Sequence, residues 1–440
     1  MKTLRPGIEM RPQPVGLHPF PAGHLLLPAE DDAEALDGLL AGDIDVRFPD
    51  AWEFYRLAAQ GEVVEARRRL LAAVEEDASA APLLQYNLFV LDPSAPAYAS
   101  LRAELAGPIA ELLDTAAYAA GIRDDVPSPR ELDGELRALA LSVSAAADLE
   151  RGDERAALKK LKDAAWGARE PSPIYAAMLL AQMCDIGSSS GEMAPALVIQ
   201  GYRQAIDLAG HCRLPRVVPE LYLRLGTALH AAAEGRRGML LQAIQAYQKA
   251  LQCGACEADC PDLFGQLQSN LGLAYMAMPA MEAGHHLRTG IAIQSFRRAL
   301  KVFDKERHPD FWASASMNLA NALQYAPSSH PEENLIQAVQ IYEDVLQVRS
   351  RAKDPVAYAL VLMNQANALA HLGMFRPAIE KLTEAHKLFQ WYDAVDHARA
   401  ARELLEQIHR HRARLRREER AVQPDAGNGA TREASPLRPQ

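Results

Sequence analysis

Aromatic residues are scarce in this 440-residue sequence, at 6%. Its apolar residues are mainly Ala and Leu rather than Val, Ile and Tyr, and this choice favours helices over strands. Hydrophobic residues make up 49% and charged residues 24%, which are ordinary values for a chain that buries a core. The composition therefore excludes wholesale disorder and an all-β fold, and predicts a helical protein.

Long apolar runs and cysteines are also few. The best candidate for a membrane span, Ile174 to Ile186, is shorter than the roughly 18 residues required. The first residues, MKTLRPGIEMRPQPVG, lack the apolar stretch of a secretory signal. Five cysteines in a long chain argue against a disulfide framework. We expect a cytoplasmic protein with no membrane contact, and the net charge of −10 makes general nucleic-acid binding an unfavoured function.

Proline density and helical periodicity divide the chain into five segments. Residues 1–50 hold seven prolines and predict an extended Pro-rich arm, which we expect to pack along the first helices. Helical hairpins with one apolar face per helix follow. The expected segments are the arm at 1–50, divergent helical hairpins at 51–172, a repeat array at 173–398, a basic capping helix at 399–420 and a disordered tail at 421–440.

The second half of the chain repeats itself. The strings YLRLGTALHAA, QSNLGLAYMAM, SMNLANALQYA and LMNQANALAHL align at Arg224, Asn270, Asn318 and Asn364, which are 46, 48 and 46 residues apart. Each is followed by a second string, AIQAYQKAL, AIQSFRRAL, AVQIYEDVL or AIEKLTEAH. A proline stands nine residues before each of the three asparagines and marks the start of a helix.

These paired strings resemble the two-helix repeat of the tetratricopeptide (TPR) superfamily, and the long spacing is most similar to TPR arrays found with CHAT protease domains. No CHAT domain accompanies them. The resemblance implies an all-α, TPR-like α-solenoid, here of about six to seven helical hairpins. Small residues such as Ala274, Ala322 and Ala368 are then expected to let the helices approach closely. Such a fold is a poor guide to function.

The aligned asparagines form the first candidate site. In TPR proteins the first helices line a concave groove, where an amide side chain can hold a peptide because it both donates and accepts hydrogen bonds. The alternative is that the same amides bind neighbouring helices and keep the repeats in register. We predict a partner-binding face, whose members are Arg224, Asn270, Tyr275, Asn318, Asn321, Tyr325, Asn364 and Asn367.

The string CGACEADCP forms the second candidate site. Cys253 and Cys256 are spaced to chelate one metal ion, and Cys260 could add a third ligand. Equivalent loops of stacked repeats lie roughly 10 Å apart, so Cys212 or His211 could supply the fourth, with His285 or His286 in reserve. Zinc or an iron–sulfur cluster would suit such ligands. A reversible thiol pair and plain buried cysteines are the alternatives.

Catalysis finds no support. GSSSG at 187–191 satisfies G-x-S-x-G without the strand that strains a nucleophile elbow. We therefore expect a non-catalytic scaffold or assembly factor that holds a protein or peptide partner. The basic stretch from Arg399 to Arg420 is expected to be a solvated capping helix, with a docking site for an acidic partner or RNA as the alternative. The alternative is a metal-binding accessory protein of a metalloenzyme. A receptor controlling transcription or proteolysis is a third class that the sequence leaves open.

Overall fold

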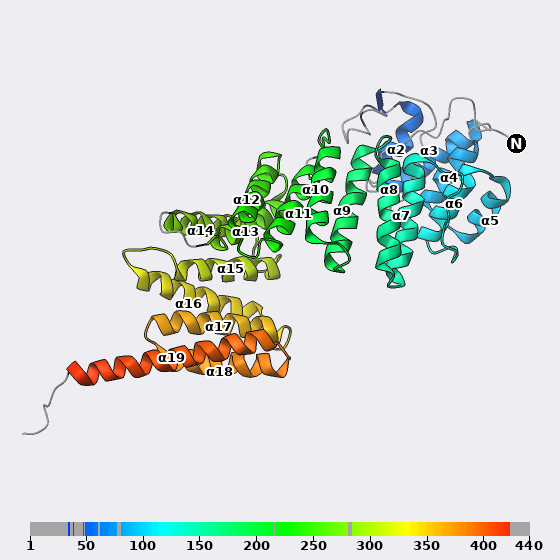
Figure 1. The fold of residues 1–440 in the computed structure, drawn as a ribbon. Helices are drawn as coiled ribbons and strands as arrows, with labels where there is room; N and C mark the ends of the chain where they lie inside the picture. The colour runs from blue at the N-terminus through cyan, green and yellow to red at the C-terminus, as the bar shows by residue number, and fades with distance from the viewer. Residues whose placement is uncertain are drawn as a thin grey trace, which may run out of the picture. The chain divides into compact units, whose positions relative to one another are not determined.

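The computed structural model describes residues 34, 35, 38, 47, 49–59, 62–76, 81–214, 216–279 and 284–422. Over this part of the chain it is helical throughout and contains no strand (Figure 1). It divides into two compact units, unit 1 up to Leu267 and unit 2 from Gln268. No helix of the described residues is long and apolar enough to cross a membrane.

Unit 1 begins with a short 3₁₀ helix, η2 (Asp50–Trp52). It continues with α2 (Glu53–Ala59), α3 (Val63–Glu76), α4 (Ala81–Leu91), α5 (Ala95–Glu104), α6 (Pro108–Ala119), α7 (Gly134–Glu150), α8 (Glu154–Ala168), α9 (Pro173–Ser189), α10 (Pro195–Leu208), α11 (Val217–Ala231) and α12 (Arg237–Gln252). The boundary between the units falls within α13 (Pro261–Met276). Unit 2 contains α14 (His285–Val302), α15 (Pro309–Gln324), α16 (Pro331–Val348), α17 (Pro355–His371), α18 (Phe375–Trp391) and α19 (Val395–Val422).

The all-α, TPR-like solenoid class is confirmed, with more helices than expected. From α7 to α18 the chain forms six hairpins, in each of which we call the odd-numbered helix the A helix and the even-numbered helix the B helix. The excess lies between residues 53 and 119, where five short helices stand before the first regular hairpin. Prolines at the first turns of α5 and α6 divide this region more finely than the hydrophobic periodicity suggested.

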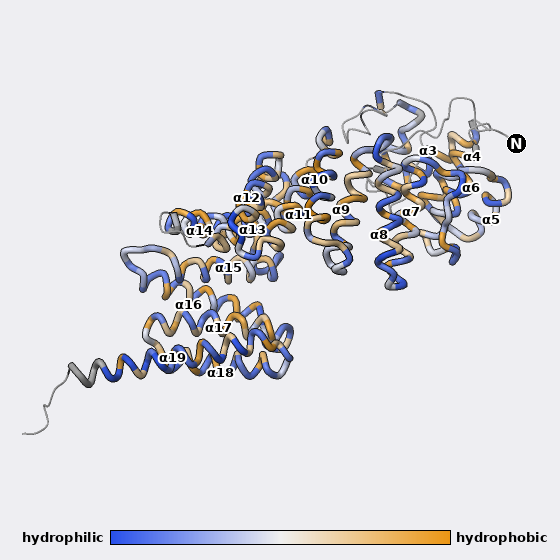
Figure 2. Tube along the Cα trace, in the orientation of Figure 1, coloured by the Kyte–Doolittle hydropathy of each residue, from blue (hydrophilic) through white to orange (hydrophobic). Residues whose placement is uncertain are grey.

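The ends of the chain lie mostly outside the described residues. The expected extended arm at 1–50 is described only at isolated positions, where Glu34, Ala35 and Gly38 are helical and Ala35 is buried in the core of the first helices. The tail expected from residue 421 falls outside the described residues beyond Val422. The basic helix expected at 399–420 is part of α19, in which hydrophilic residues dominate (Figure 2).

The helices begin at residues that interrupt the preceding segment or that satisfy the free N–H groups of the first turn. The A helices α9, α13, α15 and α17 each start at a proline, which tolerates the first turn because it has no N–H to satisfy. At α17 the carboxylate of Asp354 also accepts a hydrogen bond from the N–H of Ala357 at 2.9 Å. The proline signals read from the sequence thus mark true helix starts.

Small residues let each A helix approach the aromatic side chain of its B helix. A Cβ on Gly226 would lie 2.4 Å from Cε1 of Tyr247, and a Cβ on Gly272 would lie 2.6 Å from Cε1 of Phe296. Both distances are far shorter than van der Waals contact. Ala274, Ala322 and Ala368 are fully buried at neighbouring positions, as expected for close helix packing.

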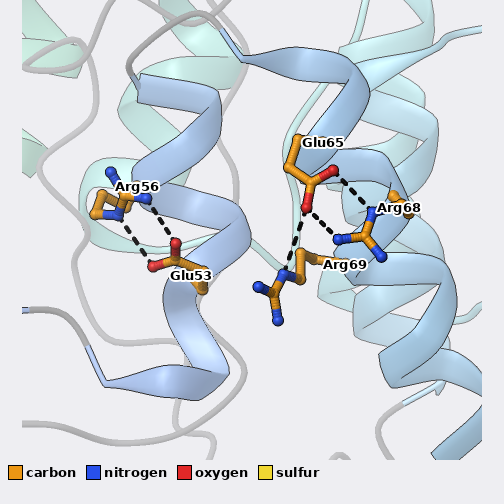
Figure 3. A network of polar contacts seen from close by, with 5 residues as sticks. All are labelled: Glu53, Arg56, Glu65, Arg68 and Arg69. Atoms are coloured by element: carbon orange, nitrogen blue, oxygen red, sulfur yellow. Dashed lines mark hydrogen bonds and ion pairs between the residues drawn. The ribbon is translucent and has the colours of Figure 1, made fainter.

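Ion pairs form between side chains one turn apart on α2 and on α3 (Figure 3). On α2 the guanidinium of Arg56 contacts both carboxylate oxygens of Glu53, at 3.0 and 2.6 Å, and on α3 Glu65 pairs with Arg68 and, at 3.7 Å, with Arg69. The hydrogen bonds from Arg56 hold the pKa of Glu53 below its ordinary value. Because these side chains are partly exposed to solvent, each ion pair contributes little to stability.

Candidate functional site

A cavity of about 550 Å³ opens across three successive A helices of unit 1, α7, α9 and α11. Because equivalent helices of adjacent hairpins lie side by side, their corresponding faces line one continuous groove. We call this cavity the A-helix groove. Its lining is mainly apolar and comprises Leu139, Val143, Ala146, Met178, Leu179, Ala181, Val217 and Leu221, with Ser142, Tyr175, Gln182, Asp185, Glu220 and Arg224 as its polar members.

The groove contains the position that aligns across the repeats. Arg224, predicted from the sequence, lies in its wall on α11. Gln182 occupies the same place on α9, nine residues after Pro173, as Asn270, Asn318 and Asn364 follow the prolines that begin their helices. We call this the anchor position. Sequence reasoning missed Gln182, although the same proline spacing was there to find it.

Arg224 is held by a carboxylate from the preceding hairpin. It forms an ion pair with Oδ2 of Asp185 on α9, while the hydroxyl of Tyr202 on α10 donates to Oδ1 of the same carboxylate at 2.5 Å. Burial, reinforced by that hydrogen bond, raises the pKa of Tyr202. The side chain of Arg224 remains 39% exposed, so its guanidinium keeps N–H groups that can reach a ligand.

The other polar groups of the groove are paired, with one exception. The hydroxyls of Ser142 and Tyr175 lie 3.2 Å apart, and Glu220 accepts a hydrogen bond from Arg216 at 3.0 Å. Gln182 is exposed, and its side-chain amide forms no hydrogen bond with the described residues. The groove therefore offers an apolar floor, an unpaired amide and a guanidinium neutralised by its neighbour.

In unit 2, two of the predicted asparagines are engaged within the fold. Oδ1 of Asn321 on α15 accepts a hydrogen bond from the hydroxyl of Tyr342 on α16 at 2.5 Å. Gln324 donates to the same hydroxyl at 2.7 Å and accepts a hydrogen bond from Asn367 on α17 at 3.0 Å. This network joins three helices. For Asn321 and Asn367, the interpretation as residues that keep the repeats in register is the one that the contacts support.

The remaining asparagines differ from that pair. Asn318 and Asn364, at the anchor positions of α15 and α17, are half-buried, and their amides form no hydrogen bond with the described residues. Asn270 and Tyr275 on α13 are half-buried and do interact with other groups in the chain. Tyr325, at the end of α15, is 56% exposed. Asn318 and Asn364 are thus the predicted residues of unit 2 with amides available to a ligand.

The cysteines do not assemble as expected. Cys253 is exposed at the end of α12, Cys212 is half-buried, and Cys260 is buried at the start of α13. The thiol of Cys256 donates to Oδ2 of Asp259 at 2.8 Å. Nowhere among the described residues do three His, Cys, Asp or Glu side chains gather as a metal site requires, so Cys212, His211 and the three cysteines of 253–260 form no ligand set there.

The inter-repeat loops themselves do meet, as the metal hypothesis assumed. Arg216, four residues after Cys212, contacts both carboxylate oxygens of Asp262, two residues after Cys260, at 3.2 and 2.8 Å. Burial raises the pKa of both the Cys212 and the Cys260 thiols, which keeps them protonated. The two loops are thus joined by an ion pair instead of by shared thiolate ligands.

Comparison with known proteins identifies no family. No family model matches this chain, and no curated protein does. Among solved structures, apo RapI is 14% identical with a TM-score of 0.48, covering 82% of this chain and 97% of its own. BtubC of P. vanneervenii is 18% identical with a TM-score of 0.37, covering 66% and 98%, and the APC/C complex Cut9–Hcn1 is 16% identical with a TM-score of 0.42, covering 80% and 62%. These similarities are too weak to support an inference about function.

Proposed function

We propose that this protein is a non-catalytic scaffold that holds an extended segment of a partner protein in the A-helix groove of unit 1. The observation that carries the proposal is the apolar cavity of about 550 Å³ shared by α7, α9 and α11, with Gln182 and Arg224 at corresponding anchor positions beside it. Ligand sites are typically concave, mostly apolar and supplied with a few placed polar groups.

The size of the groove sets the length of the segment. Adjacent helices pack about 10 Å apart, so three A helices span roughly 20 Å. An extended chain advances about 3.3 Å per residue, which makes the bound segment about six residues long. Apolar side chains of the segment would pack against Met178, which is 38% exposed, and against Val143 and Leu221.

The charges of the groove favour an uncharged stretch of main chain over a carboxylate or phosphate. Arg224 is already paired with Asp185, and Glu220 with Arg216, so every charged side chain of the lining has a partner of opposite sign. The free amide of Gln182 and the remaining N–H groups of Arg224 suit peptide carbonyl and N–H groups. Binding is therefore expected to depend weakly on salt and not to require a free C-terminus.

A displayed library of random decapeptides, selected against the full chain, tests the proposal. Enriched peptides are expected to share bulky apolar residues and to bind equally well with an amidated C-terminus in a fluorescence polarisation assay. Enrichment of peptides that need a free carboxylate, or no enrichment at all, would contradict it.

Variants of the A-helix groove distinguish specific peptide binding from nonspecific hydrophobic association. Met178→Glu places a charge on the apolar floor and should weaken an enriched peptide by about tenfold or more, because burying an unpaired charge is costly. Gln182→Ala should weaken it by about three- to tenfold through a lost hydrogen bond. The matched control is Leu197→Glu, which puts the same charge at a 55% exposed position on α10 and should leave affinity unchanged.

We propose a similar role in unit 2 for Asn318 and Asn364. Their free amides lie at equivalent places on the neighbouring A helices α15 and α17, so one extended segment could contact both. A double Asn318→Ala and Asn364→Ala variant should weaken a peptide that binds unit 2 while its helicity, measured by circular dichroism, stays unchanged.

A further inference from the structure

The second half of α19 extends beyond the hairpin against which the helix packs (Figure 1). Ala401 and Ile408 are buried against α17 and α18, and the ring of His411 lies 5.8 Å from that of Phe375. After Ile408 no described side chain of the helix is buried. The helix nevertheless continues to Val422, about 21 Å further at 1.5 Å per residue.

This free end is strongly basic. Between His409 and Arg417 the sequence HRHRARLRR holds five arginines and no acidic residue. Arg414 contacts the ring nitrogen of His411 at 3.2 Å. The other four, Arg410, Arg412, Arg416 and Arg417, form no ion pair with the side chains that the structure describes, which on this helix end at Arg417.

Like charges at this spacing oppose the helix that carries them. Arg410 and Arg414, and Arg412 and Arg416, are four residues apart and therefore neighbours on the helix surface. Each such pair destabilises an isolated helix. A helix end that has little tertiary packing and carries like charges at this spacing would be stabilised by a polyanion bound along it.

The distribution of the arginines identifies the kind of polyanion. Arg410 and Arg412 are two residues apart, so they point to nearly opposite sides of the helix, about 200° apart. Arg414 and Arg416 repeat this arrangement one turn later. A membrane surface would require an apolar stripe, but Leu415 is the only large apolar residue between His409 and Arg420. Cations on both sides of a rod fit a groove with phosphates along both walls.

Charge density and width agree with double-stranded DNA. Five charges over the seven steps from Arg410 to Arg417 amount to one per roughly 2 Å, while duplex DNA carries one per about 1.7 Å. The major groove of B-DNA is about 12 Å wide and admits a helix, whereas the major groove of an RNA duplex is too narrow. The negative charge on the rest of the chain is screened over about 8 Å at physiological salt, which is less than the length of the free end.

We propose that the free end of α19 binds the phosphate backbone of double-stranded DNA, without sequence preference, by lying in the major groove. This site is separate from the A-helix groove and does not depend on the proposed function. Five phosphate contacts imply a slope of log K against log salt of about −4.5, which is about a 500-fold loss of affinity between 50 and 200 mM salt.

The test measures the affinity of the full chain for a fluorescein-labelled 20-base-pair DNA duplex by polarisation over that salt range. The variant Arg410→Gln, Arg412→Gln, Arg416→Gln, Arg417→Gln should lose about four units of slope, because each removed contact costs about one. The control Arg297→Gln, Arg298→Gln, Arg376→Gln, Arg402→Gln removes the same total charge from exposed positions outside the free end and should keep the wild-type slope. Glutamine is a good helix former, so α19 should persist in both.

The proposal is overturned if the duplex does not bind at 50 mM salt, or if the two variants lose affinity equally, since overall charge would then explain the binding. Tighter binding of polyglutamate than of DNA would assign the helix to an acidic protein partner. Equal affinity for an RNA duplex of the same sequence would exclude the major groove as the docking place.

Discussion

Replacing Asn321 by Ala should destabilise the hairpin formed by α15 and α16. Tyr342 is fully buried, and its hydroxyl donates to Asn321 and accepts from Gln324. Without the Asn321 amide, the buried O–H has no acceptor, which costs roughly 1–3 kcal/mol. Asn318 lies three residues earlier on the same helix and makes no side-chain hydrogen bond with the described residues, so Asn318→Ala should change stability by less than about 0.5 kcal/mol.

Hydrogen exchange of the full chain is the suitable assay, because an array of repeats need not unfold in one step. A loss of 1–3 kcal/mol in local stability corresponds to amide exchange about 5- to 150-fold faster in α15 and α16. Asn318→Ala should accelerate exchange there by no more than about twofold. The two variants remove the same chemical group from the same helix, so each controls for the other.

A double-mutant cycle identifies the cause. In a Tyr342→Phe background the hydroxyl is absent, so Asn321→Ala should have little further effect, and the coupling between the two sites should be about 1 kcal/mol or more. If Asn321→Ala leaves exchange unchanged, or if Asn318→Ala is equally damaging, then the division into fold-bound and ligand-available asparagines is wrong.

Three further predictions follow from contacts in unit 1. Gly226→Ala should lower the midpoint of thermal unfolding followed by circular dichroism, because the new Cβ would overlap the ring of Tyr247 and overpacking costs typically 1–3 kcal/mol. Burial alone would raise the pKa of Asp148, but hydrogen bonds from Lys160 and Arg151 outweigh it and lower that pKa. The ionised carboxylate therefore stabilises the fold fully above its ordinary pKa near 4, and this contribution is lost progressively as the pH falls through the lowered pKa. Asp148→Asn should destabilise by about 1–3 kcal/mol at pH 7 and by progressively less as the pH falls below 4 in urea titrations. Arg216→Gln should speed amide exchange at the start of α13 by up to about fivefold, because it removes the solvent-exposed ion pair that joins the two loops.

The repeat architecture could be predicted because its signals are local. Prolines at residues 261, 309 and 355 mark true helix starts, and the second strings of each repeat lie on the B helices. The region from α2 to α6 could not be resolved in the same way. Its helices are short, and the core they share with α7 to α9 depends on packing between segments far apart in sequence.

The candidate site could be predicted only to the level of one helix face. Asn318 and Asn321 are three residues apart, which is about 60° around the helix axis. That rotation is enough to direct one amide to Tyr342 and to leave the other without a partner. The position of a B-helix hydroxyl decides the difference, and no pattern within the A helix reports it. The predicted cysteine ligand set was not found among the described residues for a similar reason, since the proximity of two loops does not determine which of their side chains face each other.

Comparison of the repeats with one another shows which positions serve the fold. Three residues after the anchor position, the polarity of the A-helix residue corresponds to that of the B-helix side chain packed against it. The hydroxyls of three B-helix tyrosines form hydrogen bonds with a polar residue at that position, in the pairs Tyr202–Asp185, Tyr247–Thr227 and Tyr342–Asn321. Phe296 has no hydroxyl, and it packs in one core with the apolar Leu273. In the last hairpin the B helix presents Leu382, and Asn367 bonds instead to Gln324 of the preceding hairpin.

This matching explains the polar residues at that position through internal packing, so they carry no information about a ligand. Three of the five anchor residues are different, because the amides of Gln182, Asn318 and Asn364 form no hydrogen bond with the described residues. Packing does not require an amide there, since an unpaired amide on a half-exposed face adds little to stability. A bound segment would supply the missing hydrogen-bond partners, so substitutions of Gln182, Asn318 and Asn364 should affect affinity, and substitutions three residues later should affect stability.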